Sequence, residues 1–348
     1  MPRSGHRPWR GWASAAAAAL AVTACGHATP NLAKPGVTLP SSNPSAGPSD
    51  RAVSSDRQVF PLTGLPAPSA AATAKPAVAL LVGGTAPQGL NSADVVFEEA
   101  TTPVRYVALY QSRSAANVGP VTGTQPTDRA LLPVVHPVVG YDGAATNYLI
   151  KVLDKTHVTD AGYSHDPALY TTGPAGPVTS TRAFASLGSK DTAPPPLFTY
   201  RGTGSAGTTL ATHGQSRPAS ATVSIPGFGT QDWSFDSHTD RWALTSGGPG
   251  VQVANLVIQT VGYSTDVLNA RRGTSVPVLH ITGSGRAEVL SGSVGGGRGG
   301  TAASGTWSRL HTGQVTNYFD SAGRPLAFQP GPTWVIFAPT GTQVRTSG

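Results

Sequence analysis

Two adjacent carboxylates at the end of a predicted buried strand are the residues best suited to acid–base chemistry. Glu98 and Glu99 close the apolar run that starts at Asp94. Neighbouring side chains of a strand point to opposite faces, so only one of the two can face a shared site. A carboxylate pair about 5–10 Å apart can hydrolyse a glycosidic bond. Glu98 and Asp142 are therefore the candidate catalytic residues.

Further charged residues could complete a cleft at the strand ends, where α/β sheets bind ligands. Arg105, which begins the next apolar run, is the candidate partner of Glu98 in ligand binding. The other charged residues that could line this cleft are Asp128, Arg129, Asp142, His165 and Asp166. The alternative interpretation is that these residues form ion pairs and cap turns.

The chain lacks the residue patterns typical of metal sites, phosphate-binding loops and serine-nucleophile elbows. The nine histidines show neither metal-binding spacing nor a His-Glu-x-x-His motif, and there is one cysteine, so we expect no metal site. The glycine-rich stretch 292–300 lacks the Lys-Ser/Thr ending of a phosphate-binding loop, and we expect no cofactor. Gly283-Ser284-Gly285 lacks the spacing of a nucleophile elbow and predicts a turn. A Ser-His-Asp triad stays open, because triads assemble in space.

Two features could serve carbohydrate binding. Tryptophans of the second half could stack on sugar rings, although aromatic residues in strands are mostly core: they are Trp233, Trp242, Trp307 and Trp334. The phrase Gly-Pro-Val-Thr at 119–122 recurs at 176–179. Its hydroxyls could bind a sugar, or the repeat could reflect turn chemistry and chance.

The first 24 residues have the pattern of a secretory signal peptide. Three arginines precede an apolar stretch of about ten residues, whereas a membrane-spanning helix needs about 20. Val22-Thr23-Ala24-Cys25 resembles the lipobox of bacterial lipoproteins, which predicts acylation, such as by palmitate, of Cys25. Two acyl chains suffice for stable anchoring at about 0.8 kcal/mol per buried CH₂. The alternative is an ordinary signal peptide with a nearby cysteine.

Cleavage of this peptide changes the charge of the chain. The 348 residues include 24 Lys and Arg against 17 Asp and Glu, a formal charge of +7. The leader contains three of the arginines and no acid, so the charge falls to +4, and we expect no nucleic-acid partner. Residues 25–58, rich in Pro, Ser and Ala, predict a flexible linker. The Ala-, Gly- and Arg-rich, Lys-poor composition is typical of a high-GC genome such as that of an actinobacterium.

The folded part predicts an α+β protein in which an N-terminal α/β unit is followed by a mainly antiparallel, β-rich unit. Residues 59–190 contain three apolar runs typical of strands, at 77–82, 94–98 and 105–110, and a partly helical stretch at 126–153 that prolines interrupt. Residues 191–220 predict a connecting loop. Residues 221–348 contain short alternating runs about 8–12 residues apart, as in antiparallel sheets.

Several phrases occur in the order found in a known family. They include Pro61-Leu62-Thr63-Gly64-Leu65, Gln88 to Glu98, Gly119-Pro120-Val121, Gly305-Thr306-Trp307 and Pro330 to Trp334. In these the chain resembles the YerB-like bacterial lipoproteins, a domain of unknown function (DUF3048). Gly83-Gly84 stands where the family usually has Asp-Asn, and Thr122 to Gln125 where it has Arg-Ser-Ala-Arg. If those arginines bind an anion in the family, this chain has lost or changed that ligand.

The sequence thus predicts a lipoprotein held at the extracytoplasmic face of the cell membrane by the lipid on Cys25. We expect a non-catalytic binding or scaffolding protein for a cell-wall polymer or an envelope protein. One alternative is a peptidoglycan or glycan hydrolase that uses Glu98. Another is a receptor for a small molecule.

Overall fold

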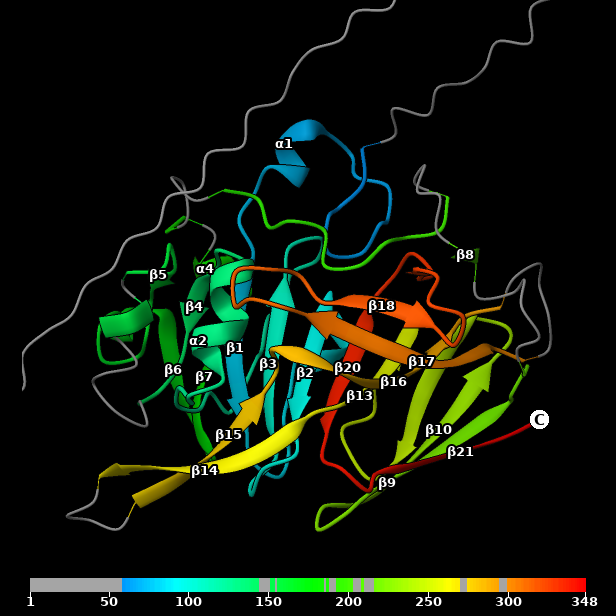
Figure 1. Cartoon of the computed structure of the whole chain (residues 1–348). Coiled ribbons are helices and arrows are strands. Elements are labelled where there is room, and N and C mark those ends of the chain that lie inside the picture. The colour runs from blue at the N-terminus through cyan, green and yellow to red at the C-terminus, as the bar shows by residue number, and fades with distance from the viewer. Residues whose placement is uncertain are drawn as a thin grey trace, which may run out of the picture. The chain divides into compact units, whose positions relative to one another are not determined.

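The apolar runs of both halves of the chain form one ten-stranded mixed sheet (Figure 1). We describe it from a computed structural model. The structure describes residues 58–143, 151–153, 155–184, 186–187, 192–202, 208–209, 216–269, 274–293 and 299–348. From edge to edge the strands are β18 (Asn317–Asp320), β17 (Thr301–Arg309), β16 (Gly283–Ser291), β13 (Asn255–Thr260), β20 (Thr333–Ala338), β2 (Val95–Glu99), β3 (Arg105–Tyr110), β1 (Val78–Gly83), β4 (Val138–Gly140) and β5 (Thr159–Asp160).

The sheet is mixed: neighbouring strands are parallel in two places and antiparallel elsewhere. β20 lies parallel to both β13 and β2, and β4 lies parallel to both β1 and β5. The remaining neighbours are antiparallel. Because β20 belongs to the predicted C-terminal region and β2 to the N-terminal one, strands of both regions share the sheet. The described residues lie in one compact unit that spans Ser55–Gly348.

A second, antiparallel sheet of five strands and three two-stranded sheets complete the β structure. The five strands are β12 (Gln252–Val253), β11 (Arg241–Ser246), β10 (Gly229–Asp236), β9 (Ser220–Ile225) and β21 (Gln343–Ser347). The pairs are β14 (Gly262–Asn269) with β15 (Thr274–His280), β19 (Leu326–Ala327) with β8 (Thr208–Thr209), and β6 (Tyr170–Gly173) with β7 (Gly176–Thr179). The α+β fold class is confirmed, with strands far outweighing helices.

The helices of the described residues are all short. They are α1 (Ala70–Thr73), α2 (Asp128–Leu131) and α4 (Thr181–Phe184), with 3₁₀ turns η1 (Leu90–Ser92), η2 (Leu132–Val134) and η3 (Pro167–Leu169). Pro133 lies in the first turn of η2, which follows α2 directly, so the predicted helix is broken as expected. Residues 151–153 are helical, and the preceding part of that predicted helix lies outside the described residues. Within the described ranges, no helix is long and apolar enough to cross a membrane.

The central strands β1, β2, β3 and β20 are buried on both faces of the sheet, which explains their continuous apolar runs. On one face, side chains such as Phe97 and Val335 contact a cluster that includes Leu132 and Phe198. On the other face, side chains such as Leu80 and Ile336 share a cluster with the five-stranded sheet. The strands of that smaller sheet alternate between buried and more exposed residues. A side chain's position along a central strand therefore decides which core it enters.

This packing decides one open alternative and corrects one expectation. The four tryptophans of the second half are buried core residues and offer no sugar-stacking surface: they are Trp233, Trp242, Trp307 and Trp334. Gly283-Ser284-Gly285 begins strand β16 and does not form a turn. A Cβ at Gly285 would lie 2.6 Å from the indole nitrogen of Trp307 and 2.7 Å from the Thr260 oxygen. The glycine is thus explained by close packing across the strand.

Candidate functional site

The two glutamates at the end of β2 face opposite sides of the ten-stranded sheet. In the pairing of β2 with β3, Glu98 lies opposite Tyr106 and Glu99 lies opposite Arg105. Both carboxylates are buried, with residue exposures of 2% for Glu98 and 0% for Glu99. The alternation expected of a strand thus separates them into two clusters with different partners.

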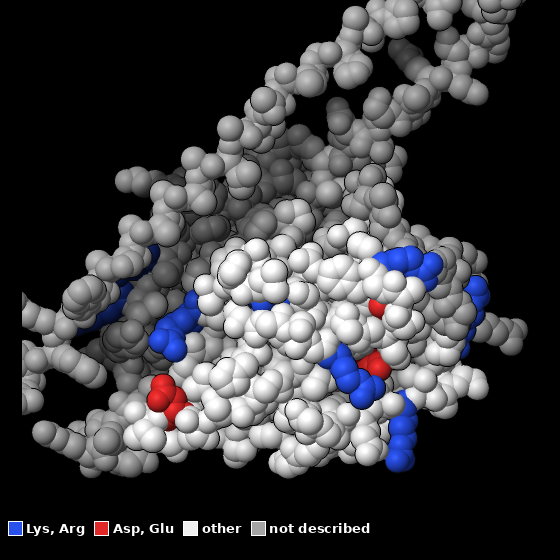
Figure 2. Space-filling model, viewed as in Figure 1, with Lys and Arg blue, Asp and Glu red and all other residues white. Residues whose placement is uncertain are grey.

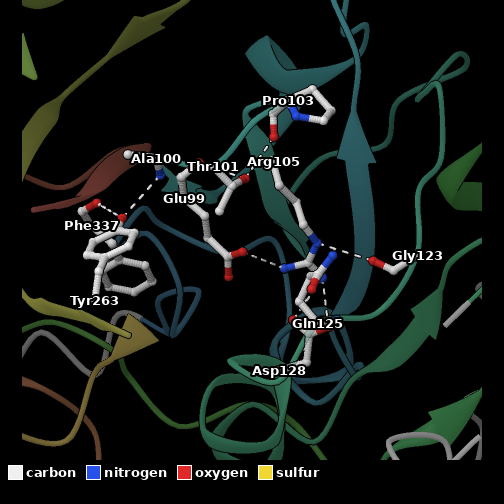
Figure 3. Close-up of polar contacts among 10 residues, drawn as sticks. All are labelled: Glu99, Ala100, Thr101, Pro103, Arg105, Gly123, Gln125, Asp128, Tyr263 and Phe337. Carbon is white, nitrogen blue, oxygen red and sulfur yellow. Dashed lines mark hydrogen bonds and ion pairs between the residues drawn. The ribbon is translucent and has the colours of Figure 1, made fainter. Parts of the chain in front are cut away.

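The first cluster, which we call the Arg105 cluster, consists of Glu99, Arg105 and Asp128 (Figure 3). Arg105 Nη1 donates to Glu99 Oε2 at 2.9 Å. Its Nη2 donates to both carboxylate oxygens of Asp128, at 2.8 and 2.7 Å, and its Nε donates to the Gly123 carbonyl at 3.2 Å. Each nitrogen of the guanidinium therefore has an internal partner, and a ligand would have to displace one of them.

The electrostatics of the Arg105 cluster follow from two carboxylates around one cation. Burial raises the pKa of Glu99, and the nearby Arg105 only partly offsets this. For Arg105, burial alone would lower the pKa, but the charges of Asp128 and Glu99 outweigh it and raise the pKa above its ordinary value. With all three groups ionised the cluster carries a net charge of −1, which disfavours an anionic ligand.

Several buried oxygens around the Arg105 cluster have no hydrogen-bond partner among the described residues. They are Glu99 Oε1, Thr124 Oγ1, Gln125 Oε1 and Thr127 Oγ1. The Gln125 amide nitrogen of the backbone does donate, to Asp128 Oδ2 at 2.8 Å. Such oxygens could accept a hydrogen bond or bind a cation. Among the described residues, however, no three His, Cys, Asp or Glu side chains form a group that could hold a metal ion.

Both departures from the family pattern lie next to the Arg105 cluster. Gly83 is the strand partner of Arg105, and its amide donates to the Pro120 carbonyl at 3.1 Å. The Thr122 amide donates to the Leu81 carbonyl at 2.8 Å, which places the segment 122–125 beside the end of β1. Gly83 and Thr122 thus lie on the backbone around the end of β1, next to Arg105.

The second cluster, which we call the Glu98 cluster, lies between the two large sheets. Gln231 Nε2 donates to Glu98 Oε1 at 2.6 Å, and Trp334 Nε1 donates to Glu98 Oε2 at 2.7 Å. Gln231 Oε1 in turn accepts from Trp233 Nε1 at 3.3 Å. No cation pairs with Glu98 among the described residues. Burial raises the pKa of Glu98 to about 7, although the two donors act in the opposite direction.

The predicted site residues do not converge in one cleft. Glu98 and Arg105 lie on opposite faces of the sheet and so do not share a site. Asp142 follows β4 and is half-buried, with its backbone amide donating to the Thr122 carbonyl at 3.0 Å. His165 and Asp166 form an exposed pair at 2.9 Å. Of the proposed lining residues, Asp128 is the one that joins Arg105, while Arg129 is exposed on α2.

Sequence reasoning did not anticipate the partners of Glu98. Gln231 and Trp334 lie 133 and 236 residues away from it along the chain. Their sequence signal is weak, because a glutamine and a tryptophan within strands are ordinary core-facing residues. Glu99, set beside Glu98 at the outset, proved to be the carboxylate that pairs with Arg105.

The repeated Gly-Pro-Val-Thr segments lie side by side. Val118 and Thr179 exchange backbone hydrogen bonds at 2.8 and 2.9 Å, and the Val121 amide donates to the Pro177 carbonyl at 2.7 Å. The Thr179 hydroxyl donates to the Leu169 carbonyl at 2.6 Å. This hydroxyl is thus used to hold the backbone.

Comparison with known proteins places the fold. Residues 62–175 match the N-terminal domain, and residues 227–335 the C-terminal domain, of the protein of unknown function DUF3048. Among solved structures, the crystal structure of YerB protein from Bacillus subtilis is similar, with a TM-score of 0.64 and 17% identity over 83% of this chain and 100% of that one. No curated protein sequence matches.

At 17% identity the likeness to YerB shows the fold alone. The two domain matches carry more weight, because they occur in the family's order and together span more than half of the chain. This chain therefore belongs to the DUF3048 family.

Proposed function

We propose that this chain is a lipid-anchored lipoprotein at the extracytoplasmic face of a bacterial cell membrane, where it binds a component of the cell envelope without turning it over. The observation that carries the anchoring is the cysteine at position 25, the only one in the chain, directly after Val22-Thr23-Ala24. Cys25 lies outside the described residues, as does the linker that follows it up to residue 57.

The non-catalytic role is supported by the state of the candidate acids. A glycosidase needs two carboxylates that reach the scissile bond from opposite sides. Glu98 is buried between two sheets and accepts hydrogen bonds from Gln231 and Trp334. Glu99 and Asp128 are ion-paired with Arg105. A substrate could reach these carboxylates only if packed elements separated.

Anchoring is tested by metabolic labelling of the full-length chain with a radioactive fatty acid, followed by detergent-phase partitioning. We expect label on the wild-type chain and none on Cys25→Ser. Thr29→Ser, a change of similar size outside the lipobox, is the matched control and should be labelled like the wild type. Label that persists in Cys25→Ser would contradict the assignment.

The binding role is tested with purified cell wall and with cross-linking of the full-length chain in cells. We expect retention on wall polymer or a cross-link to an envelope protein, and equal retention of Glu98→Gln. Release of soluble wall fragments by the wild type, lost in Glu98→Gln, would instead establish the hydrolase. The absence of both retention and cross-links would overturn the binding role.

A further inference from the structure

An open cavity of about 670 Å³ gathers positive charge at a place that no carboxylate lines. Its cations come from three separate segments: Lys75 follows α1, Arg113 follows β3, and Arg182 belongs to α4. All three side chains belong to exposed residues, and none is ion-paired among the residues that the structure describes. Exposed cations that make no ion pair and line one cavity favour an anionic ligand.

This concentration of charge stands out against the rest of the molecule. Only 12% of the residues are charged. On the face seen in Figure 2, Lys, Arg, Asp and Glu side chains are scattered over a largely uncharged surface.

The nearest carboxylate is committed to the backbone of the cavity wall. Asp94 Oδ2 accepts from the amides of Gln111 and Ser112 at 2.6 and 2.7 Å, and Asp94 Oδ1 accepts from the Ser112 hydroxyl at 2.5 Å. Asp94 is fully buried and does not line the cavity. It holds the loop that carries Arg113 in place.

Gln111, which also lines the cavity, links two of the segments that form its wall. Its Nε2 donates to the carbonyls of Thr73 and Lys75, at 3.1 and 2.9 Å, which fixes the amide's orientation and ties the Lys75 segment to the end of β3. Its Oε1 is buried and has no partner among the described residues. Ser112, Ser114 and Thr181 also line the cavity, beside the apolar surfaces of Val78, Tyr110 and Phe184.

We propose that this cavity binds the phosphate group of a hydroxylated organic phosphate, such as a polyol or sugar phosphate. Three cations arriving from separate segments suit a tetrahedral, multiply charged group better than a flat, singly charged carboxylate, and guanidinium groups match phosphate oxygens well. The volume suits a small organic molecule. The inference deepens the proposed binding role and rests on it, but it does not depend on the lipid at Cys25.

The test is calorimetric titration of the full-length chain in detergent with glycerol 3-phosphate, inorganic phosphate, acetate and glycerol. We expect glycerol 3-phosphate to bind more tightly than inorganic phosphate, and acetate and glycerol not to bind. Affinity for glycerol 3-phosphate should fall at least tenfold in Lys75→Gln/Arg182→Gln, which changes two exposed side chains. Arg286→Gln/Arg345→Gln removes two exposed arginines elsewhere, on β16 and β21, and should bind like the wild type.

Arg113→Gln gives a second measurement and should also weaken binding at least tenfold. We place this variant second because Arg113 also donates to the carbonyls of Asn91 and Ala93, so its loss could affect the local structure as well as the charge of the cavity. Absence of binding, equal binding of acetate, or an equal loss in the control variant would overturn the proposal. Wall retention and fatty-acid labelling are measured separately, so failure here is distinct from failure of the proposed function.

Discussion

Glu98 and Glu99 are neighbours on strand β2, yet their carboxylates have different kinds of partner on the two faces of the sheet. Glu99 is paired with a cation, Arg105, which also binds Asp128. Glu98 has only neutral donors, from Gln231 and Trp334. Burial penalises both charges, but only one of them is compensated by an opposite charge. The Arg105 cluster thus holds a cation between two carboxylates, whereas the Glu98 cluster has no cation, and burial raises the pKa of Glu98 to about 7.

The largest expected effect comes from removing the cation of the Arg105 cluster. Arg105→Met should lower the free energy of unfolding at pH 8 by about 3–5 kcal/mol, because it leaves two buried carboxylates unpaired. The loss should shrink as the pH falls, because burial raises the pKa of Glu99 and this carboxylate then becomes protonated. Urea unfolding at pH 8 and pH 5 measures both effects.

Arg129→Met is the matched control, since Arg129 lies next to Asp128 on the same short helix but is exposed. Its effect should stay within about 0.5 kcal/mol. An equal effect of the two substitutions would show that the Arg105 cluster has no special electrostatic role.

A smaller effect, with its own pH signature, is expected at Glu98. Burial raises its pKa from 4.5 to about 7 in the folded protein. Between these values the folded protein binds more protons than the unfolded chain, so its free energy of unfolding falls as the pH rises. The fall amounts to about 3 kcal/mol over this window, at 1.36 kcal/mol per pH unit.

Glu98→Gln should remove the contribution of Glu98 and so flatten the dependence of the free energy of unfolding on pH between pH 4.5 and 7, as measured by urea unfolding at several pH values. The side-chain amide of the new glutamine has an NH₂ group where Glu98 has an acceptor oxygen, so one of the two donors, Gln231 or Trp334, loses its acceptor. This should lower the free energy of unfolding by about 1–3 kcal/mol independently of pH. Glu288→Gln, at a half-buried glutamate of β16 whose pKa burial also raises, is the comparison variant and should flatten the slope less than Glu98→Gln does. A slope unchanged in Glu98→Gln would refute the assignment of the titrating group.

The smallest effect concerns the indole donor of the Glu98 cluster. Trp334→Phe removes a hydrogen bond to a carboxylate, whereas Trp307→Phe removes one to the neutral Thr260 carbonyl at 2.8 Å. Both tryptophans are fully buried, so their packing losses are comparable. Hydrogen bonds to charged groups are worth about 1.5–3 kcal/mol, against about 1 kcal/mol for neutral ones.

We therefore expect Trp334→Phe to be less stable than Trp307→Phe by about 1 kcal/mol at pH 8. The difference should narrow at pH 5, where Glu98 is protonated. Loss of this donor should also raise the pKa of Glu98 and extend the stability slope above pH 7. Parallel pH profiles for the two variants would show that the indole does not interact with an ionised Glu98.

Much of the local structure could be predicted from the sequence. The runs at 77–82, 94–98 and 105–110 form β1, β2 and β3 within one residue, because continuous apolar runs mark strands buried on both faces. Asp320 to Gly323 form a turn, in which the Gly323 amide donates to the Asp320 carbonyl at 3.0 Å and Gly323 has a φ of 76°.

Other elements escaped prediction for physical reasons. Strands β14 and β21 carry mostly exposed or half-buried residues where their burial is described, so no apolar pattern marks them. The joining of both halves into one sheet depends on β20 inserting between β13 and β2, a pairing between residues far apart in the chain.

The sequence by itself determined the strand signals of the central sheet, the opposite orientations of Glu98 and Glu99, and a lipobox-like motif at Cys25. Only the tertiary structure decided what each carboxylate meets. Alternation within a strand is local, so the residues themselves specify it. The partners of Glu98 come from β10 and β20, and the cations of the cavity come from three separate segments. Their meeting depends on long-range sheet pairing and packing, which no local pattern encodes.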